Sequence, residues 1–418
     1  MNILVVSQYF YPENFRINDL CSELVQQGNK VTVLTGIPNY PEGKFYNGYS
    51  LFKPLKEEWN GIEIIRVPIF PRLNNKIALI LNYFSFVLSG CFYTKVKKLP
   101  KYDLVYVFEV SPVTVAFPAI TYKKKYHVPI IMNVQDLWPE NIQAVTGLSN
   151  PFILKQIDKM VDYIYEHCDL LLTSSQCFVE KIVSRGHSKN KVQYWPQYAS
   201  GFFKKIDVPS SDSIYEELDG EFNVIFTGNI GYAQGLDVII DAANILRNNT
   251  AIKWHFVGDG RAKEELENKV KKLSLTENVK FWGRKPESEM PKYLSVADAA
   301  LLVLKQDKVF EMTLPAKLQT YFACEIPVLA SIDGEAAEAV KKAKAGYVSP
   351  AGDAEKLAEI VLDMFKISQE KREQMGVNAR LYFDYHFDKE KLLRELNNHM
   401  IENISKSDIN RKFVKSSI

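Results

Sequence analysis

The stretch Phe226-Thr-Gly-Asn-Ile-Gly-Tyr-Ala-Gln-Gly-Leu-Asp237 joins a predicted strand to a predicted helix. The apolar run Phe222–Phe226 indicates the strand, and apolar residues at helical spacing from Leu236 to Leu246 indicate the helix. Three glycines in such a turn let backbone N–H groups approach a ligand at the positive end of a helix dipole. The stretch therefore predicts a phosphate cradle, with tight strand-to-helix packing as the alternative interpretation.

Length and composition restrict the class of protein. A chain of 418 residues exceeds one ordinary core and predicts two domains. Its 52 basic and 50 acidic residues give no overall field for nucleic acid, so we expect no nucleic-acid partner. Five scattered cysteines without a Cys-x-x-Cys pair indicate neither a zinc site nor a disulfide framework. Residues 1–7 lack a basic signal-type region, so we expect a cytoplasmic protein.

The first half of the chain repeats a strand, turn and helix. Ile3–Val6 is typical of a buried parallel strand, Arg16–Gln27 of a helix that ends at Gly28, and Lys30–Thr35 of a second strand. Further strands are predicted at Ile62–Val67, Leu104–Phe108, Ile130–Val134 and Leu170–Thr173. This rhythm favours an α/β doubly wound, Rossmann-like sheet.

The same rhythm restarts in the second half, after a charged and serine-containing stretch. Its predicted strands are Phe222–Phe226, Lys253–Val257, Val279–Trp282, Ala299–Leu304 and Pro327–Ala330. We therefore predict domains at residues 1–200 and 222–385, joined by a linker at 201–221 and facing each other across a cleft that binds ligands at the carboxyl ends of the strands. Residues 386–418 are predicted as a helix and tail, with packing against the first domain as one option, and a break in the helical pattern is expected near Gly376.

Further motifs follow the glycine stretch in a fixed order. They are Val257-Gly-Asp-Gly-Arg261, Phe281-Trp-Gly-Arg-Lys285 and Phe310-Glu-Met-Thr-Leu-Pro-Ala-Lys-Leu-Gln319. Together they resemble the family 4 glycosyltransferases of GT-B architecture, which transfer a sugar from a nucleotide diphosphate with retention of configuration. The segments Thr35-Gly-Ile-Pro-Asn-Tyr-Pro41 and Gln135-Asp-Leu-Trp-Pro-Glu140 resemble a branch that acts in O-antigen and capsule assembly and includes N-acetyl-fucosamine-type amino-sugar transferases.

The resemblance implies a donor site in the second domain. Its residues would be Gly228, Asn229, Gly231, Gln234, Gly258, Gly283, Arg284, Leu314, Lys317 and Gln319. The E-x7-E motif of the family matches Glu311 and Gln319, so Glu311 would bind the donor sugar as a catalytic residue and Gln319 the ribose. The family usually carries Arg and Lys where this chain has Asn229 and Gln234. We therefore expect Lys317 to supply the charge for the diphosphate, a solvated helix lysine being the alternative.

The first domain carries candidate residues for the acceptor. Asp136 follows a predicted strand and is the candidate acid that orients or deprotonates the acceptor hydroxyl, although it could instead cap a turn above Trp138. Glu13, Asn14, Arg16 and Glu140 are further acceptor-side candidates, and Arg16 is also a second candidate cation for the diphosphate. Same-face attack assisted by the leaving phosphate would need no protein nucleophile. With no Asp-x-Asp motif beside the site, we predict that no metal or other cofactor is required.

The most apolar stretch, Ile77–Tyr93, is shorter than the roughly 20 residues that span a bilayer. Three polar residues form a narrow stripe on it, and four lysines follow directly: Lys95, Lys97, Lys98 and Lys101. This pattern fits a helix in the interface of an anionic membrane, and it fits a core helix equally well. The first interpretation would place the protein peripherally on the inner face of the cytoplasmic membrane, beside a polyprenyl-diphosphate-linked acceptor.

The sequence therefore predicts a transferase that moves a sugar from a nucleotide sugar, with UDP as the nucleotide, to a lipid-linked or oligosaccharide acceptor. Two alternatives remain open. A nucleotide-sugar 2-epimerase of the same architecture would need no acceptor. A non-catalytic nucleotide-sugar-binding protein would be consistent with the neutral residues at positions 229, 234 and 319.

Overall fold

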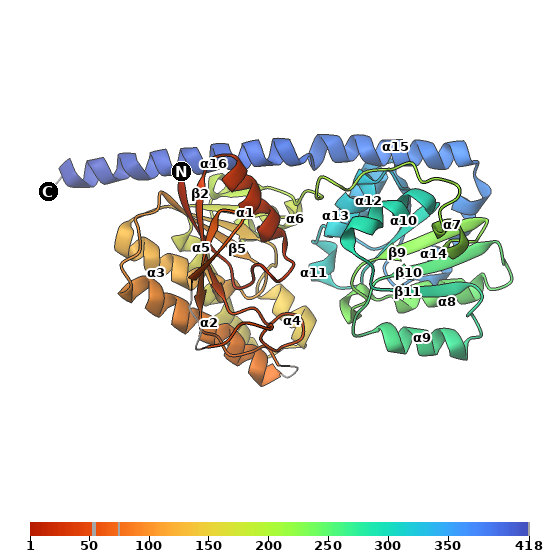
Figure 1. Ribbon diagram of the computed structural model, residues 1–418, viewed down its shortest axis with the longest axis horizontal. Coiled ribbons are helices and arrows are strands. Elements are labelled where there is room, and N and C mark those ends of the chain that lie inside the picture. Colours follow the sequence, from red (N-terminus) through yellow and green to blue (C-terminus); the bar gives the residue numbers. More distant parts are fainter. Residues whose placement is uncertain (52–55, 74–75, 417–418) are drawn as a thin grey trace. The chain divides into compact units, whose positions relative to one another are not determined.

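The computed structural model describes residues 1–51, 56–73 and 76–416 (Figure 1). These residues form two compact units. The first comprises residues 1–174, 178–195 and 394–418, and the second comprises residues 175–177 and 196–393. Each unit is a mainly parallel sheet covered by helices, which is the α/β organisation that the sequence predicts.

The first unit contains an eight-stranded sheet in the order β3-β4-β2-β1-β5-β6-β7-β8. The strands are β1 (Asn2–Val6), β2 (Lys30–Gly36), β3 (Lys56–Trp59), β4 (Ile62–Val67), β5 (Leu104–Glu109), β6 (Ile130–Val134), β7 (Leu170–Thr173) and β8 (Val192–Tyr194). The helices are α1 (Arg16–Gln26), α2 (Lys76–Val96), α3 (Phe117–Tyr126), α4 (Glu140–Thr146), α5 (Pro151–His167) and α6 (Gln176–Ser184). All strands except β3 run parallel, so the carboxyl ends of β1, β2, β5 and β6 meet at one edge.

Two edge strands of this sheet were not predicted. β3 is rich in charged residues and pairs antiparallel with β4 through an Asn-Gly turn, in which Asn60 has φ 50° and Gly61 has φ 76°. Such a turn suits the twist of a hairpin. β8 has only three residues. Both strands lack the continuous apolar run by which buried parallel strands are identified, since an edge strand is covered less completely.

The second unit contains a six-stranded parallel sheet in the order β11-β10-β9-β12-β13-β14. The strands are β9 (Phe222–Thr227), β10 (Ile252–Val257), β11 (Val279–Gly283), β12 (Ala299–Val303), β13 (Val328–Ser331) and β14 (Gly346–Ser349). The helices are α7 (Ile214–Glu217), α8 (Asp237–Ile245), α9 (Lys263–Lys272), α10 (Met290–Val296), α11 (Lys308–Glu311), α12 (Ala316–Ala323), α13 (Glu335–Ala343), α14 (Ala354–Lys366) and α15 (Gln369–His386). Here too the carboxyl ends of the strands share one edge, where the glycine stretch lies.

The structure bears on three boundary expectations, and two of them need correction: the free linker and the break near Gly376. Residues 201–221 are not a free linker, because Phe203, Ile214 and Leu218 are buried in the core of the second unit. The final helix α16 (Lys389–Ser416) begins in the second unit, and its residues from Arg394 onward group with the first unit. The helical pattern does not break at Gly376, which lies inside α15; a Cβ there would be 2.1 Å from the Glu325 carbonyl oxygen, so the glycine permits close packing.

A buried histidine joins three strands of the second unit. His255 lies on β10, where its Nδ1 accepts a hydrogen bond from Trp282 Nε1 at 3.2 Å. Its Nε2 therefore carries the proton and donates to Asn223 Oδ1 at 2.9 Å. Burial lowers the pKa of His255 to about 4. The neutral imidazole is thus part of the packing of the sheet.

Acidification is expected to destabilise the second unit through His255. The unfolded chain binds a proton near pH 6.5, whereas the folded unit resists it down to about pH 4. The free energy of unfolding should therefore decrease by about 3 kcal/mol as the pH falls from about 6.5 to about 4. Hydrogen exchange of peptides from β9, β10 and β11 measures this, and His255→Gln should remove most of the difference. An equal loss in His255→Gln would assign the effect to other groups; His127→Gln, an exposed site in the first unit, is the control.

Candidate active site

The glycine stretch of the second unit forms a close backbone contact at the ends of β9 and β10. Gly228 has φ +116° and Gly258 has φ +154°, and a Cβ on Gly258 would lie 1.8 Å from the Gly228 carbonyl oxygen. No other residue type would fit at position 258 without displacing the backbone. The two turns are thereby held together, and Gly283 O accepts a hydrogen bond from Gly258 N at 2.8 Å. The predicted donor glycines at 228, 258 and 283 are thus brought together.

Lys317 lies directly beside this glycine stretch. It is in the first turn of α12, and its Nζ donates to Gln234 Oε1 at 2.8 Å. The same Nζ lies 4.2 Å from the centre of the Phe226 ring, and a Cβ on Gly228 would touch the Lys317 Cε at 2.8 Å. Among the described residues it forms no ion pair with a carboxylate, and burial lowers its pKa to about 7. The ammonium group of Lys317 therefore lies next to the neutral side chain of Gln234.

A second lysine, missed by the sequence reasoning, approaches the other end of the stretch. Lys305 follows β12, and a Cβ on Gly235 would lie 3.0 Å from the Lys305 Cγ. Its side chain is exposed. The sequence did contain a usable indication, because Lys305 comes two residues after the buried strand β12. The carboxyl end of β12 lies at the same edge of the sheet as that of β9. Two lysines thus flank the glycine stretch, whereas Arg16 belongs to the first unit.

The remaining donor-side residues differ in how accessible they are. Asn229 and Arg284 are exposed, and the Asn229 amide lies so close to Gly231 that a Cβ there would meet its Nδ2 at 2.7 Å. Leu314 is buried in the core of the unit. Asn229 and Arg284 can therefore reach a ligand, while Leu314 contributes packing.

Glu311 is exposed at the end of α11, on a backbone that is held in place. Asp307 caps this helix, because its Oδ1 accepts from Val309 N at 2.9 Å. The turn before α13 packs against Glu311, since a Cβ on Gly334 would lie 1.9 Å from the Glu311 carbonyl oxygen. The carboxylate is thus free to bind a ligand while its backbone is fixed by two neighbours.

Gln319 does not take the predicted position in the site. Its side chain is fully buried, and in the amide orientation that satisfies both of its polar atoms the nitrogen donates to the carbonyl oxygens of Pro315 at 2.8 Å and Ala316 at 3.0 Å. These two acceptors belong to the start of its own helix and satisfy the amide. The expected ribose contact is therefore replaced by an internal bond that closes the first turn of α12.

Two carboxyl groups lie together at the acceptor-side edge of the first unit. Asp136 Oδ2 accepts from Ser111 N at 2.9 Å, and burial raises the pKa of Asp136. Glu109, which ends β5, accepts from Gln135 N at 3.2 Å and Asp136 N at 3.1 Å through its Oε2. Burial, together with the nearby Asp136 charge, raises the pKa of Glu109 well above its usual range. Glu109 was missed, although an acid at the end of a buried strand is a usable signal.

The other acceptor-side candidates are mostly engaged within the first unit. The buried Glu13 accepts backbone hydrogen bonds from Asn39 at 2.8 Å and Tyr40 at 2.7 Å, and burial raises its pKa to about 7. Glu140 forms an ion pair with Lys181 at 3.1 Å. Glu13 therefore fixes two loops rather than facing an acceptor, and Glu140 anchors α4 to α6. Asn14 is exposed, and Arg16 begins α1 half-buried.

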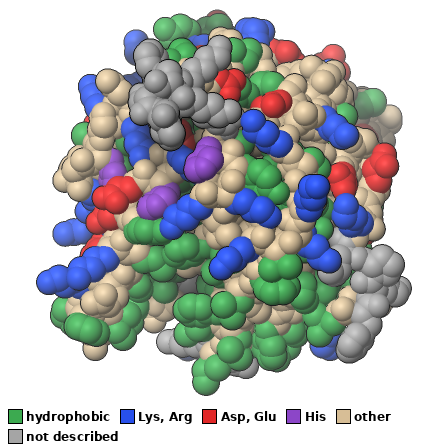
Figure 2. All heavy atoms as spheres, turned by 90° about the vertical axis from the view of Figure 1, so that its left-hand side faces the viewer, with side chains coloured by type: hydrophobic (Ala, Val, Ile, Leu, Met, Phe, Trp, Pro, Cys, Tyr) green, Lys and Arg blue, Asp and Glu red, His purple; other side chains and the backbone are tan. Residues whose placement is uncertain are grey.

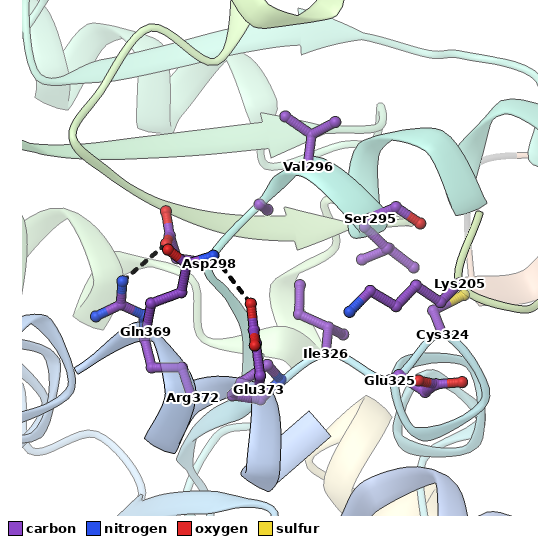
Figure 3. A pocket seen from close by; sticks show the side chains of 13 residues that line it. Lys205, Ser295, Val296, Asp298, Cys324, Glu325, Ile326, Gln369, Arg372 and Glu373 are labelled. Carbon is purple, nitrogen blue, oxygen red and sulfur yellow. Dashed lines mark hydrogen bonds and ion pairs between the residues drawn. The ribbon is translucent and has the colours of Figure 1, made fainter. Parts of the chain in front are cut away.

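A pocket of about 150 Å³ in the second unit lies away from these groups (Figure 3). It is next to the amino ends of β12 and β13, opposite the glycine edge. Four of its lining residues pair with one another: Arg372 pairs with Asp298 at 3.4 Å, and Gln369 donates to Glu373 at 2.9 Å. Nothing in this pocket calls for an anionic ligand. Across the described residues, no three His, Cys, Asp or Glu side chains gather in a group that could hold a metal.

Helix α2 exposes its large apolar side chains and buries a row of mostly small or polar residues, which is the reverse of a usual surface helix. Every fourth residue from position 78 faces the protein, and this buried row consists of Ala78, Asn82, Phe86, Gly90 and Thr94. Large apolar side chains face outward, among them Phe84, 60% exposed, and Leu88, 69% exposed. Residues Ile77–Val96 are long and apolar enough to cross a membrane, yet only 28% of that segment is buried. Of the two interpretations that the sequence left open, a core helix does not fit this exposure. The helix also extends beyond Ile77–Tyr93, so the expectation that the stretch is too short to span a bilayer is wrong.

Cations accompany this exposed face. Between Glu63 and Asp103 the sequence contains seven Lys and Arg residues and no Asp or Glu. Lys125 on α3 donates to the carbonyl oxygens of Lys95 at 3.0 Å and Lys97 at 3.2 Å, which brings the lysines of α3 next to those that follow α2. Figure 2 shows hydrophobic side chains along the lower edge of this face and Lys and Arg side chains above them.

Family comparisons match both halves of the chain. Residues 14–197 match the glycosyl transferase 4-like domain, and residues 209–382 match glycosyl transferases group 1. The chain is 26% identical over 339 residues to WcaI of Escherichia coli strain K12, a glycosyl transferase assigned to colanic acid biosynthesis, covering 77% of this chain and 81% of WcaI. It is 25% identical over 217 residues to the amylovoran biosynthesis glycosyltransferase AmsK of Erwinia amylovora, covering 51% of this chain and 52% of AmsK.

Solved structures share the fold at low sequence identity. Sucrose-phosphate synthase from Thermosynechococcus elongatus superposes with a TM-score of 0.75 at 15% identity, covering 97% of this chain and 99% of that one. Anabaena HepE in complex with UDP superposes with a TM-score of 0.72 at 16% identity, covering 96% of this chain and 100% of HepE. The matches extend over both units.

Proposed function

Because this chain is a glycosyltransferase of the GT-B fold, related to the group 1 and 4-like families, we propose that it moves a sugar from a UDP-sugar to a lipid-linked or oligosaccharide acceptor in bacterial surface polysaccharide synthesis. Relatives assigned to colanic acid and amylovoran biosynthesis support the pathway class, and HepE with bound UDP supports the nucleotide. From the resemblance to amino-sugar transferases, we propose an N-acetylated amino or deoxyamino sugar and retention of configuration.

The donor half of this proposal is carried by the contact of Lys317 with the glycine stretch. The N–H groups of Gly228, Ile230 and Gln234 already donate to backbone carbonyls. A diphosphate there would receive the other N–H groups of residues 228–235, and positive charge from Lys317 and Lys305. Glu311 would bind the hydroxyl groups of the sugar. Because these groups can take the charge of the leaving diphosphate, we propose that transfer needs no metal ion.

The acceptor half is carried by the neighbouring Asp136 and Glu109. In the proposed step, the acceptor hydroxyl oxygen bonds to the anomeric carbon while the bond from that carbon to the diphosphate oxygen breaks. The hydroxyl proton passes to the leaving diphosphate on the same face. Asp136 would orient the hydroxyl through a hydrogen bond, and Glu109 holds the Asp136 backbone in place through the bond to its N–H.

Incubating the purified protein with a panel of UDP-sugars, with and without membrane lipid extract, tests the function. We expect a glycosylated product only when the extract is present, and NMR of its anomeric proton should show the configuration of the donor. A changed sugar nucleotide in the absence of extract would instead support a 2-epimerase. Donor binding without turnover under every acceptor would support a binding protein.

The outward apolar face of α2 supports a peripheral position on the inner face of the cytoplasmic membrane. Polar and small residues already satisfy the inward side: Asn82 accepts from Gln8 Nε2 at 2.6 Å, and Thr94 donates to the Gly90 carbonyl at 3.0 Å. Among residues 1–51, 56–73 and 76–416, nothing covers outward side chains such as Phe84 and Leu88, which remain largely exposed. Anionic lipid complements the lysines beside it, and each such cation near a charged bilayer contributes about 1 kcal/mol.

Removing two of these outward side chains is expected to detach the protein from lipid. The double variant Phe84→Ser/Leu88→Ser should bind anionic phosphatidylglycerol vesicles about 30-fold more weakly in a flotation assay, because two largely exposed apolar groups no longer enter the bilayer. Leu381→Ser, which removes a similarly exposed leucine from α15, is the matched control. Equal flotation of all three proteins would contradict membrane attachment through α2.

A further inference from the structure

The guanidinium group of Arg72 lies between two tyrosine rings, at the edge of the first unit where the acceptor is proposed to bind. It lies between β4 and α2, and its backbone N–H donates to Asn39 Oδ1 at 2.8 Å. The guanidinium carbon is 5.1 Å from the centre of the Tyr40 ring, and Nη1 donates to the Tyr9 hydroxyl at 3.3 Å. These contacts fix the position of the cation without neutralising it.

No carboxylate pairs with Arg72 among the described residues. Two other arginines of this unit have acidic partners: Arg66 pairs with Glu57, and Arg185 pairs with Asp158 at 2.9 Å and with Asp162 at 2.8 Å. Holding a partly buried cation without a counter-ion is unfavourable unless a ligand supplies the charge. A planar guanidinium pre-positioned in this way is suited to bind a phosphate through two parallel hydrogen bonds.

The surroundings of Arg72 connect two features already described. The charges of Arg72, Asp136 and Glu109 all act on the half-buried Tyr83 of α2. Arg72 and the two carboxyl groups therefore belong to the surroundings of the same side chain.

The apolar face of α2 continues up to Arg72. Phe70 O accepts from Asn82 Nδ2 at 2.6 Å, and Phe70 N donates to Ser85 Oγ at 2.8 Å, so this loop is attached to the first half of α2. Phe70 and Leu73, on either side of Arg72, are both exposed. A molecule with an anionic group next to an apolar chain would match this surface, with its anion at Arg72 and its chain on the exposed apolar side chains.

We propose that Arg72 binds a phosphate group of the acceptor, and that this phosphate belongs to a prenyl diphosphate whose chain lies along the exposed face of α2. This inference rests on the proposed function, because it assigns the chemical class of the acceptor. It adds a binding residue outside the donor site and a reason for the position of the apolar face. The prenyl chain and the phosphate are recognised by different groups, so they can be tested separately.

Titration calorimetry with geranyl diphosphate, on protein saturated with UDP to occupy the donor site, tests this proposal. Arg72→Met should weaken binding at least tenfold, and Arg72→Lys should restore part of it because the charge remains. Lys155→Met removes an exposed cation from α5 of the same unit and should change the affinity less than threefold. Circular dichroism before titration verifies that each variant is folded, and Arg72→Lys serves as the folded comparison where Arg72→Met is unstable.

Two further ligands distinguish the sources of phosphate. Geraniol, which lacks the phosphates, should not bind measurably, and inorganic pyrophosphate should bind at least tenfold more weakly than geranyl diphosphate. Equal affinity for pyrophosphate would assign Arg72 to a soluble phosphate instead of a lipid. Equal affinity of wild type and Arg72→Met for geranyl diphosphate would overturn the proposal even where sugar transfer is observed. Arg72-dependent binding in a protein without any transfer would overturn only the proposed function.

Discussion

Replacing Lys317 with methionine is expected to weaken the binding of UDP by about 100-fold, since a charge-assisted hydrogen bond to a phosphate contributes about 1.5–3 kcal/mol. Methionine keeps the length and the apolar contact with the Phe226 ring, so the glycine stretch should keep its conformation. Titration calorimetry with UDP measures the loss. Lys253→Met, at the amino end of β10 and so at the opposite edge of the same sheet, should bind UDP like the wild type.

The same lysine gives UDP binding a distinct pH dependence. Burial lowers the pKa of Lys317 to about 7 in the free protein, and a bound diphosphate would raise it. Only the protonated form attracts the diphosphate, so the affinity should decrease about tenfold for each pH unit above 7. The affinity of Lys317→Met should stay level over the same range. A level profile in the wild-type protein would rule out Lys317 as the diphosphate cation.

The second large effect is expected at Glu311. Glu311→Gln should reduce kcat for sugar transfer by about 100- to 1000-fold, because the amide cannot replace charge-assisted bonds to sugar hydroxyls that strengthen in the transition state. Affinity for UDP, which lacks the sugar, should change less than threefold. Stability should be retained, since the side chain is exposed and the contact with Gly334 uses the backbone.

Glu355→Gln provides the control for this variant, because Glu355 is another exposed acid of the second unit, at the start of α14. Its kcat should match that of the wild type. Undiminished transfer by Glu311→Gln would remove Glu311 from the site. A parallel loss of UDP affinity would point instead to a disturbed glycine stretch.

The sequence was most informative about buried strands and about positions where the backbone requires glycine. Continuous apolar runs identified the central strands of both sheets, and glycines at 228 and 258 identified a contact that only glycine permits. The role of Lys317 as the diphosphate cation, expected because the family's usual charges are absent at Asn229 and Gln234, stays a prediction, and its place beside the glycine stretch is compatible with it. For the strands and the two glycines, a short stretch of sequence is enough to show what the structure needs, namely burial on both faces or a backbone position without a Cβ.

The expectations that differ from the structure concern side chains whose partners the pattern does not reveal. Gln319 was expected to face a ligand, but its amide can be satisfied inside its own helix turn. Glu13 is occupied by backbone groups of Asn39 and Tyr40, which lie on another loop. Arg72 was not singled out, because its lack of an acidic partner among the described residues is visible only in three dimensions. Helical periodicity also could not tell which face of α2 is covered.

The inward hydrogen bonds of α2 have a consequence for how the protein would work over many cycles. Because Asn82 bonds to Gln8 and to the Phe70 carbonyl from the inward side, the position of the helix in the first unit does not depend on whether lipid covers the outside. Attachment and release then require no refolding, only exchange of lipid for water on a preformed surface. An enzyme built in this way can leave one acceptor and meet the next without losing the geometry of its acceptor site.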